Sequence, residues 1–164
     1  MYHVILNHEG TKAQIFLCLG AFVVKIQAKG ILTMRCFEPL PPEVEIVATA
    51  VVDSAYKIHR ALGPGLIESV YELCLVHELR KRGFEVRTQL DLPIRYDDIT
   101  IKSGLRPDIL VADVLIVEVK AVEQLHPVHQ AQVLTYLKLM NRRLGLLINF
   151  NVAVISKGIK RIIL

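Results

Sequence analysis

The sequence predicts an α/β fold in which helices flank a mixed β-sheet. Apolar residues recur at three- and four-residue steps over residues 43–62, the spacing of an amphipathic helix. After Gly83 the apolar period changes to two, which indicates strands. An apolar run over residues 114–117 indicates a central strand covered on both faces. The predicted order is helix, helix, three strands, helix, strand, strand, which is typical of an α/β sandwich.

Two helices open the predicted domain. The first covers residues 43–62 and ends at the turn Gly63-Pro64-Gly65. The second covers residues 67–82, and Gly83 stops it. Basic residues fill its last turn, a position that suits the helix dipole.

Strands and one more helix follow. We expect strands over residues 84–96 and 99–111, interrupted near Gly104, and a third strand over residues 114–122. Pro127 opens a helix that runs to residue 143, because the missing N–H of a proline costs little in the first turn. Short apolar strands over residues 144–150 and 159–164 complete the order.

The first 42 residues form a separate N-terminal extension, and residues 43–164 form the domain, because a proline cluster lies between them. The apolar run over residues 15–24 is too short for a bilayer-spanning helix, which needs roughly 20 residues. One interpretation of this run is a secretory signal peptide, although a poor cleavage region follows it. The alternative is an accessory extension produced by a start codon assigned too early, with Met34 as the initiator.

Composition narrows the class of protein. The chain has 164 residues, 52% of them hydrophobic, and a formal net charge of +4, so it is neither disordered nor basic enough to prove a nucleic-acid partner. Its three cysteines are odd in number and lack CxxC spacing, so the sequence indicates neither a disulfide framework nor a zinc knuckle. We therefore expect a cytoplasmic protein without a membrane partner.

Two charged residues interrupt the predicted central strand. Glu118 and Lys120 are two apart and therefore project from the same face. Asp108 precedes them by ten residues and would pair with Glu118, about 5 Å away, if the connecting loop has an odd number of residues. Two carboxylates at that distance repel each other unless a cation lies between them, and oxygen ligands favour Mg²⁺ or Mn²⁺. The alternative is a plain ion pair at the end of a strand.

These residues resemble the signature of a known superfamily. Pro107-Asp108, a spacer and then Glu118-Val119-Lys120 are similar to the motif of the PD-(D/E)xK nucleases, whose restriction-endonuclease-like core has the order predicted above. Gln132 and Tyr136 resemble the QxxxY motif of RecB-type members. The segment over residues 65–71 matches GxxExxY, the motif of a bacterial family of that superfamily, and the resemblance covers residues 44–164.

The resemblance implies a metal-dependent nuclease. Asp108, Glu118, the carbonyl of Val119 and Glu68 would hold one or two Mg²⁺ or Mn²⁺ ions, and Lys120 would orient or deprotonate the attacking water. Gln132 and Tyr136 would fix Lys120 or contact the phosphate backbone. For Glu68 the alternative role is a first-turn acid that favours the helix dipole, and for Tyr136 it is core packing.

The expected partner is nucleic acid, DNA rather than RNA, and the apolar composition is compatible with a homodimer. The alternative function is a catalytically idle module of the same fold that binds nucleic acid or a protein. His126 and His129 could reach a phosphate or lie as solvated surface residues. The cations that could contact phosphates without reading sequence are Arg80, Lys81, Arg82, Arg142 and Arg143.

Overall fold

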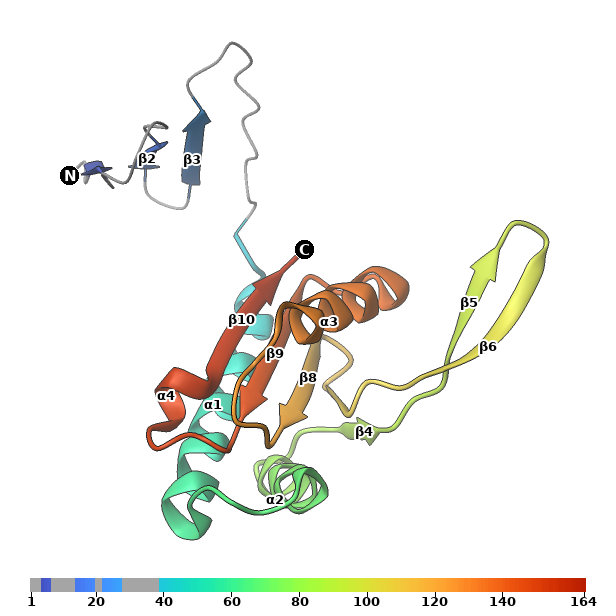
Figure 1. Cartoon of the computed structure of the whole chain (residues 1–164). Coiled ribbons are helices and arrows are strands. Elements are labelled where there is room, and N and C mark those ends of the chain that lie inside the picture. The colour runs from blue at the N-terminus through green and yellow to red at the C-terminus, as the bar shows by residue number, and fades with distance from the viewer. Residues whose placement is uncertain (1–3, 7–13, 20–21, 28–38) are drawn as a thin grey trace. The chain divides into compact units, whose positions relative to one another are not determined.

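The structure is a computed structural model that describes residues 4–6, 14–19, 22–27 and 39–164. The chain divides into two compact units, Met1–Pro41 and Pro42–Leu164 (Figure 1). Within the described residues, no helix is both long enough and apolar enough to cross a membrane.

The first unit contains a three-stranded antiparallel sheet. Its strands are β1 (Val4–Leu6), β2 (Gln14–Leu19) and β3 (Phe22–Gln27), in the order β1-β2-β3. Strands β2 and β3 contain most of the apolar run over residues 15–24. Met34 lies outside the described residues.

The second unit contains a mixed five-stranded sheet, which confirms the predicted fold class. The sheet has the order β10-β9-β8-β7-β4, in which only β8 and β9 pair in parallel. The central strand β8 is buried along almost its whole length, as its continuous apolar run predicts. The five strands are β4 (Val86–Thr88), β7 (Ile109–Val111), β8 (Leu115–Lys120), β9 (Leu144–Asn149) and β10 (Ile159–Ile163).

Helices cover both faces of this sheet (Figure 1). Helix α3 (Pro127–Met140) packs through Val133, Tyr136 and Leu137 on the face that carries Ile116 and Leu147. A Cβ at Gly145 would lie only 2.5 Å from Cγ1 of Val133, so this glycine permits the close approach of α3. Helices α1 (Pro42–Leu62) and α2 (Glu68–Lys81) pack against each other and against β8, and the short α4 (Ile155–Gly158), which the sequence did not predict, precedes β10.

Two predicted strands were wrong in extent. The predicted strand over residues 84–96 is two strands, β4 and β5 (Leu92–Tyr96), and the one over residues 99–111 is also two, β6 (Ile99–Leu105) and β7. Strands β5 and β6 form a separate antiparallel ribbon that extends away from the sheet (Figure 1). Gln89 and Gly104 adopt φ values of 50° and 68°, outside the range of an extended strand, so the chain leaves the sheet near these residues.

Candidate active site

Strands β7 and β8 place Asp108 and Glu118 side by side. Their antiparallel register pairs Ile109 with Val117, and one further step in that register sets Asp108 opposite Glu118, as the sequence parity predicts. Asp108 Oδ2 accepts a hydrogen bond of 2.8 Å from the backbone N–H of Val119. The aspartate that precedes β7 is therefore held directly against the strand that carries Glu118.

The Lys120 ammonium lies among three carboxylates. Its Nζ is 2.7 Å from Glu118 Oε1, 3.2 Å from Glu68 Oε1 and 4.0 Å from Asp108 Oδ2. The side chain of Glu118 is 2% exposed, that of Lys120 12% and that of Glu68 41%. The cluster thus runs from a buried carboxylate at the sheet to a half-exposed carboxylate at its rim.

Glu68 reaches this cluster from the first residue of α2. Just before it, the loop that joins α1 to α2 is held by Tyr71, whose hydroxyl donates to the carbonyl of Gly63 at 2.7 Å and accepts from the N–H of Leu66 at 3.1 Å. The Tyr71 ring is fully buried and stacks on Phe150 with a centroid distance of 4.4 Å. The glutamate and the tyrosine of GxxExxY therefore have different roles, since one contacts Lys120 and the other fixes the loop.

Gln132 and Tyr136 lie on the face of α3 that covers the sheet. Tyr136 is buried in the core, and its hydroxyl accepts a hydrogen bond of 2.8 Å from Gln132 Nε2 and donates to the carbonyl of Arg106 at 3.4 Å. Arg106 comes two residues before Asp108. The pair therefore anchors the segment that leads to the aspartate, and the hydrogen bonds described for it do not involve Lys120.

Burial and crowding shift the ionisation of this cluster. Burial, and next the charge of Asp108, raise the pKa of Glu118 to about 7 in spite of its hydrogen bond from Lys120. Burial also raises the pKa of Asp108, and its hydrogen bond from Val119 only partly offsets this. Burial by itself lowers the pKa of Lys120, but the neighbouring carboxylates outweigh it and the net shift is upward. Lys120 is therefore an ammonium at neutral pH.

The donor set at the end of β8 suits a hard divalent cation. Glu118 Oε2 is buried without a hydrogen-bond partner, and buried carboxylate oxygens are normally paired or bound to a cation. Within the residues that the structure describes, however, no three side chains of His, Cys, Asp or Glu are grouped closely enough to hold one ion. Asp108 and Glu118 thus supply two carboxylates, while Glu68 contacts Lys120.

The basic residues predicted to contact phosphates lie at different places in the domain and have different partners. Arg80 donates to the carbonyl of Val86 at 3.1 Å, and Arg142 pairs with Asp113 at 2.7 Å. The guanidinium of Arg82 lies 3.9 Å from Asp53, and Lys81 is exposed. Arg143 lies in the turn before β9, where its carbonyl accepts from the N–H of Leu164.

The two histidines near the start of α3 cap that helix. His129 Nδ1 accepts a hydrogen bond of 3.2 Å from the N–H of His126, so the proton of the neutral His129 ring is on Nε2. Burial lowers the pKa of His129, and the charge of Lys120 adds to the effect. No histidine joins the carboxylate cluster as a potential metal ligand within the described residues.

Asn149 is a site-supporting residue that the sequence did not single out by itself. It is 2% exposed and lies opposite Lys120 in the parallel register of β8 and β9. Its side-chain amide donates to the carbonyl of Val122 at 2.8 Å and accepts from the N–H of Val122 at 3.1 Å. A polar residue at the end of an apolar strand was the signal that could have identified it.

Comparison with known proteins agrees with this arrangement. A family model described as the PD-(D/E)XK nuclease superfamily matches residues 45–162, which is more than half of the chain. The chain belongs to the PD-(D/E)XK nuclease superfamily. This membership supports a nuclease-type function on a nucleic-acid substrate, and nucleases of the superfamily typically use divalent metals. A search of curated proteins found no match, and neither did a search of solved structures.

Proposed function

We propose that this protein is a metal-dependent nuclease that hydrolyses phosphodiester bonds in DNA, and that it belongs to the GxxExxY group of its superfamily. The observation that carries the proposal is the pairing of Asp108 with the buried Glu118 beside the Lys120 ammonium. A structural ion pair needs one carboxylate for one ammonium, whereas here three carboxylates converge on one Lys120. Two of these carboxylates, Asp108 and Glu118, are buried, and one ammonium balances only one of them, so the second needs a proton or a further cation.

Asp108 and Glu118 are the residues that would hold the cation, together with the main-chain carbonyl of Val119. The unpartnered Oε2 of Glu118 provides one ligand atom. Mg²⁺ is the expected ion, with Mn²⁺ as its substitute, because all the ligand atoms are oxygens. When bound, the ion would neutralise charge on the scissile phosphate and lower the pKa of a water molecule.

Lys120 would serve as a donor to the reacting phosphate and water. Its raised pKa keeps the ammonium charged at neutral pH. A charged donor stabilises the negative charge that develops on the phosphate oxygens in the transition state. We therefore favour orientation and electrostatic stabilisation over proton abstraction as its role.

Glu68 would set the direction of Lys120. Its carboxylate, which is 41% exposed, lies 3.2 Å from the ammonium, whereas the carboxylate of Glu118 on the other contact is buried. Glu68 would become a metal ligand only if this contact opened. Gln132 and Tyr136 would act from behind the site by fixing the segment before Asp108.

Cleavage of single- and double-stranded DNA with and without Mg²⁺ tests the proposal. We expect Mg²⁺-dependent products with the wild type and a loss of at least about 100-fold with Asp108→Asn or Lys120→Gln, the scale of removing one transition-state donor. Asp113→Asn is the matched control, because Asp113 is an exposed carboxylate paired with arginines. Cleavage that survives both site substitutions would refute the assignment of Asp108 and Lys120 to the active site. Metal binding without any cleavage would identify an idle nuclease-fold module instead.

A further inference from the structure

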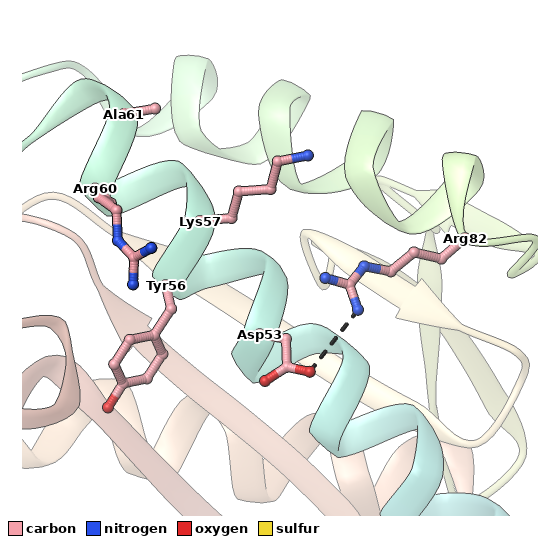
Figure 2. A pocket seen from close by; sticks show the side chains of 6 residues that line it. All are labelled: Asp53, Tyr56, Lys57, Arg60, Ala61 and Arg82. Atoms are coloured by element: carbon pink, nitrogen blue, oxygen red, sulfur yellow. Dashed lines mark ion pairs between the residues drawn. The ribbon is translucent and has the colours of Figure 1, made fainter.

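Apart from the carboxylate cluster, a polar pocket lies along α1 near the C-terminal end of α2. Its volume is about 670 Å³. Figure 2 shows that most of its lining side chains come from α1 and that Arg82 reaches in from the residue after α2. The α1 positions are three and four residues apart, so they form one stripe of the helix. The lining residues are Asp53, Tyr56, Lys57, Arg60, Ala61 and Arg82.

The pocket is lined by three cations and one carboxylate. Lys57 is fixed by Glu78, whose Oε2 lies 2.7 Å from its Nζ. Arg82 lies 3.9 Å from Asp53, and both side chains are substantially exposed (Figure 2). The side chain of Arg60 has no hydrogen-bond or ion-pair partner among the residues that the structure describes. One guanidinium is therefore unpaired, and a second is held only by a long, solvent-exposed pair that yields readily to a better anion.

The cationic groups of this pocket suit a phosphate better than an apolar ligand. Arginine presents a planar fork of N–H donors that matches phosphate oxygens. Tyr56, a residue that is 40% exposed, also lines the pocket, and its hydroxyl extends away from α1 (Figure 2). An anion bound in the pocket would also reduce the electrostatic repulsion between the side chains of Arg60, Lys57 and Arg82.

We propose that this pocket binds a backbone phosphate of the nucleic acid, at a distance from the bond that is cleaved. The proposal rests on the nuclease function proposed above and adds a second contact to it. Helix α2 connects the two places, since Glu68 is its first residue and Arg82 follows its last. Fourteen helical residues span roughly 20 Å. At 3.4 Å per phosphate, that length corresponds to roughly six nucleotides of one strand.

Salt-dependent binding of a DNA duplex of about 20 base pairs tests the pocket, with fluorescence anisotropy measured in EDTA between about 50 and 200 mM salt. Each lost phosphate contact lowers the slope of log affinity against log salt by about 0.9. We expect the slope of Arg60→Gln/Arg82→Gln to be smaller than that of the wild type by 1 to 2, on the order of one or two contacts. Lys138→Gln/Lys157→Gln is the matched control, because it removes the same charge from two exposed lysines outside the pocket.

The outcomes separate the pocket from the nuclease function. An unchanged slope in the arginine variant, or an equal loss in the lysine control, would overturn the pocket proposal. Saturable binding of inorganic phosphate that Arg60→Gln abolishes, with the duplex slope unchanged, would assign the pocket to free phosphate and also overturn it. Cleavage in Mg²⁺ is scored separately, so a wild type that binds DNA through Arg60 and Arg82 without cleaving it contradicts only the nuclease function.

Discussion

Lys120 sits at the point where three segments of the chain meet. Glu118 comes from its own strand, Asp108 from the residue before the neighbouring strand and Glu68 from α2, 52 residues earlier. Each carboxylate is held near the others by the ammonium, and the ammonium stays charged because of them. The interaction is mutual, so removal of the one cation has consequences for all three anions.

Replacement of Lys120 is expected to destabilise the metal-free protein. Lys120→Gln leaves the buried Glu118 beside Asp108 without a compensating charge, and loss of one partner of a buried pair costs about 3–5 kcal/mol. Urea denaturation in EDTA measures the free energy of unfolding, with Lys138→Gln as the exposed-lysine control. A loss equal to that of the control would mean that the buried charges do not depend on Lys120.

The stability of the metal-free protein is expected to fall between pH 4.5 and 7. The pKa of Glu118 rises from 4.5 to about 7 on folding, so the folded state binds its proton more tightly than the unfolded state does. The resulting stabilisation is complete below the unfolded pKa and is lost as the pH rises through the folded pKa. A shift of this size corresponds to about 3 kcal/mol.

Denaturation of the wild type and Glu118→Gln across this pH range measures the contribution of Glu118. The glutamine cannot ionise, so the difference in unfolding free energy between the two proteins should change steadily with pH and level off above about pH 7. A difference that stays constant from acid to neutral pH would show that Glu118 ionises normally in the folded protein.

At the scale of the elements, the loop between α1 and α2 is the part of the site that depends most on one side chain. The hydroxyl of Tyr71 forms hydrogen bonds with the backbone of Gly63 and Leu66, and Glu68 lies two residues after Leu66. Gly63 and Gly65 adopt positive φ values of 69° and 100°, a backbone conformation that glycine reaches without strain, so these two residues allow the turn that the hydroxyl holds. The orientation of Glu68 toward Lys120 is therefore expected to depend on this tyrosine.

Tyr71→Phe is expected to cost about 1–3 kcal/mol of stability, since it removes the two hydrogen bonds of the Tyr71 hydroxyl, with the carbonyl of Gly63 and the N–H of Leu66. It should also lower cleavage by loosening Glu68, while retaining metal binding at Asp108 and Glu118. Thermal denaturation and a cleavage assay measure the two effects. Tyr96→Phe is the control, because Tyr96 is 66% exposed on the β5–β6 ribbon. An equal effect of the two substitutions would contradict the role of the Tyr71 hydroxyl.

The sequence predicted the elements whose signal is local. The regular spacing of Val44, Val47 and Val51 predicted α1, where all three are buried, and the continuous apolar run predicted β8. The pairing of Asp108 with Glu118 was expected for a connecting loop with an odd number of residues, and residues 112–114 between β7 and β8 meet that condition. The sequence did not show that the predicted strands over residues 84–96 and 99–111 are each divided between the five-stranded sheet and the β5–β6 ribbon. The alternation of apolar residues continues through both parts.

Other features of the site depend on tertiary contacts and were not predictable in this way. The contact between Glu68 and Lys120 joins segments that are far apart in sequence, and no periodicity encodes it. The role of Tyr71 was hidden for a similar reason, since its hydroxyl bonds backward to a loop whose conformation two glycines allow. The hydrogen bonds of Asn149 around Val122 cross from one strand end to another.

At the scale of the whole molecule, the family match over residues 45–162 falls within the compact unit Pro42–Leu164. This unit contains both helices of the site, the complete five-stranded sheet and the β5–β6 ribbon. The homodimer and the cytoplasmic location expected from composition stay predictions.

A chain that begins at Pro42 is expected to fold by itself. All the described hydrogen bonds and ion pairs of the carboxylate cluster lie within this unit, so truncation should leave the melting temperature and the DNA cleavage of the domain unchanged. Circular dichroism during heating and the cleavage assay compare it with the full chain. An unfolded or inactive truncated chain would show that residues 1–41 are part of the functional domain.

The central claim is that Asp108 and Glu118 hold a divalent cation beside Lys120. A crystal structure of the wild type with Mn²⁺, examined through the anomalous scattering of manganese, tests it most directly. We expect one peak bound by oxygens of Asp108 and Glu118 and by the carbonyl of Val119, at about 2.0–2.4 Å, and no peak in Glu118→Gln. A wild-type structure that holds no Mn²⁺ at these oxygens, with Lys120 still bound to Glu118, would contradict it.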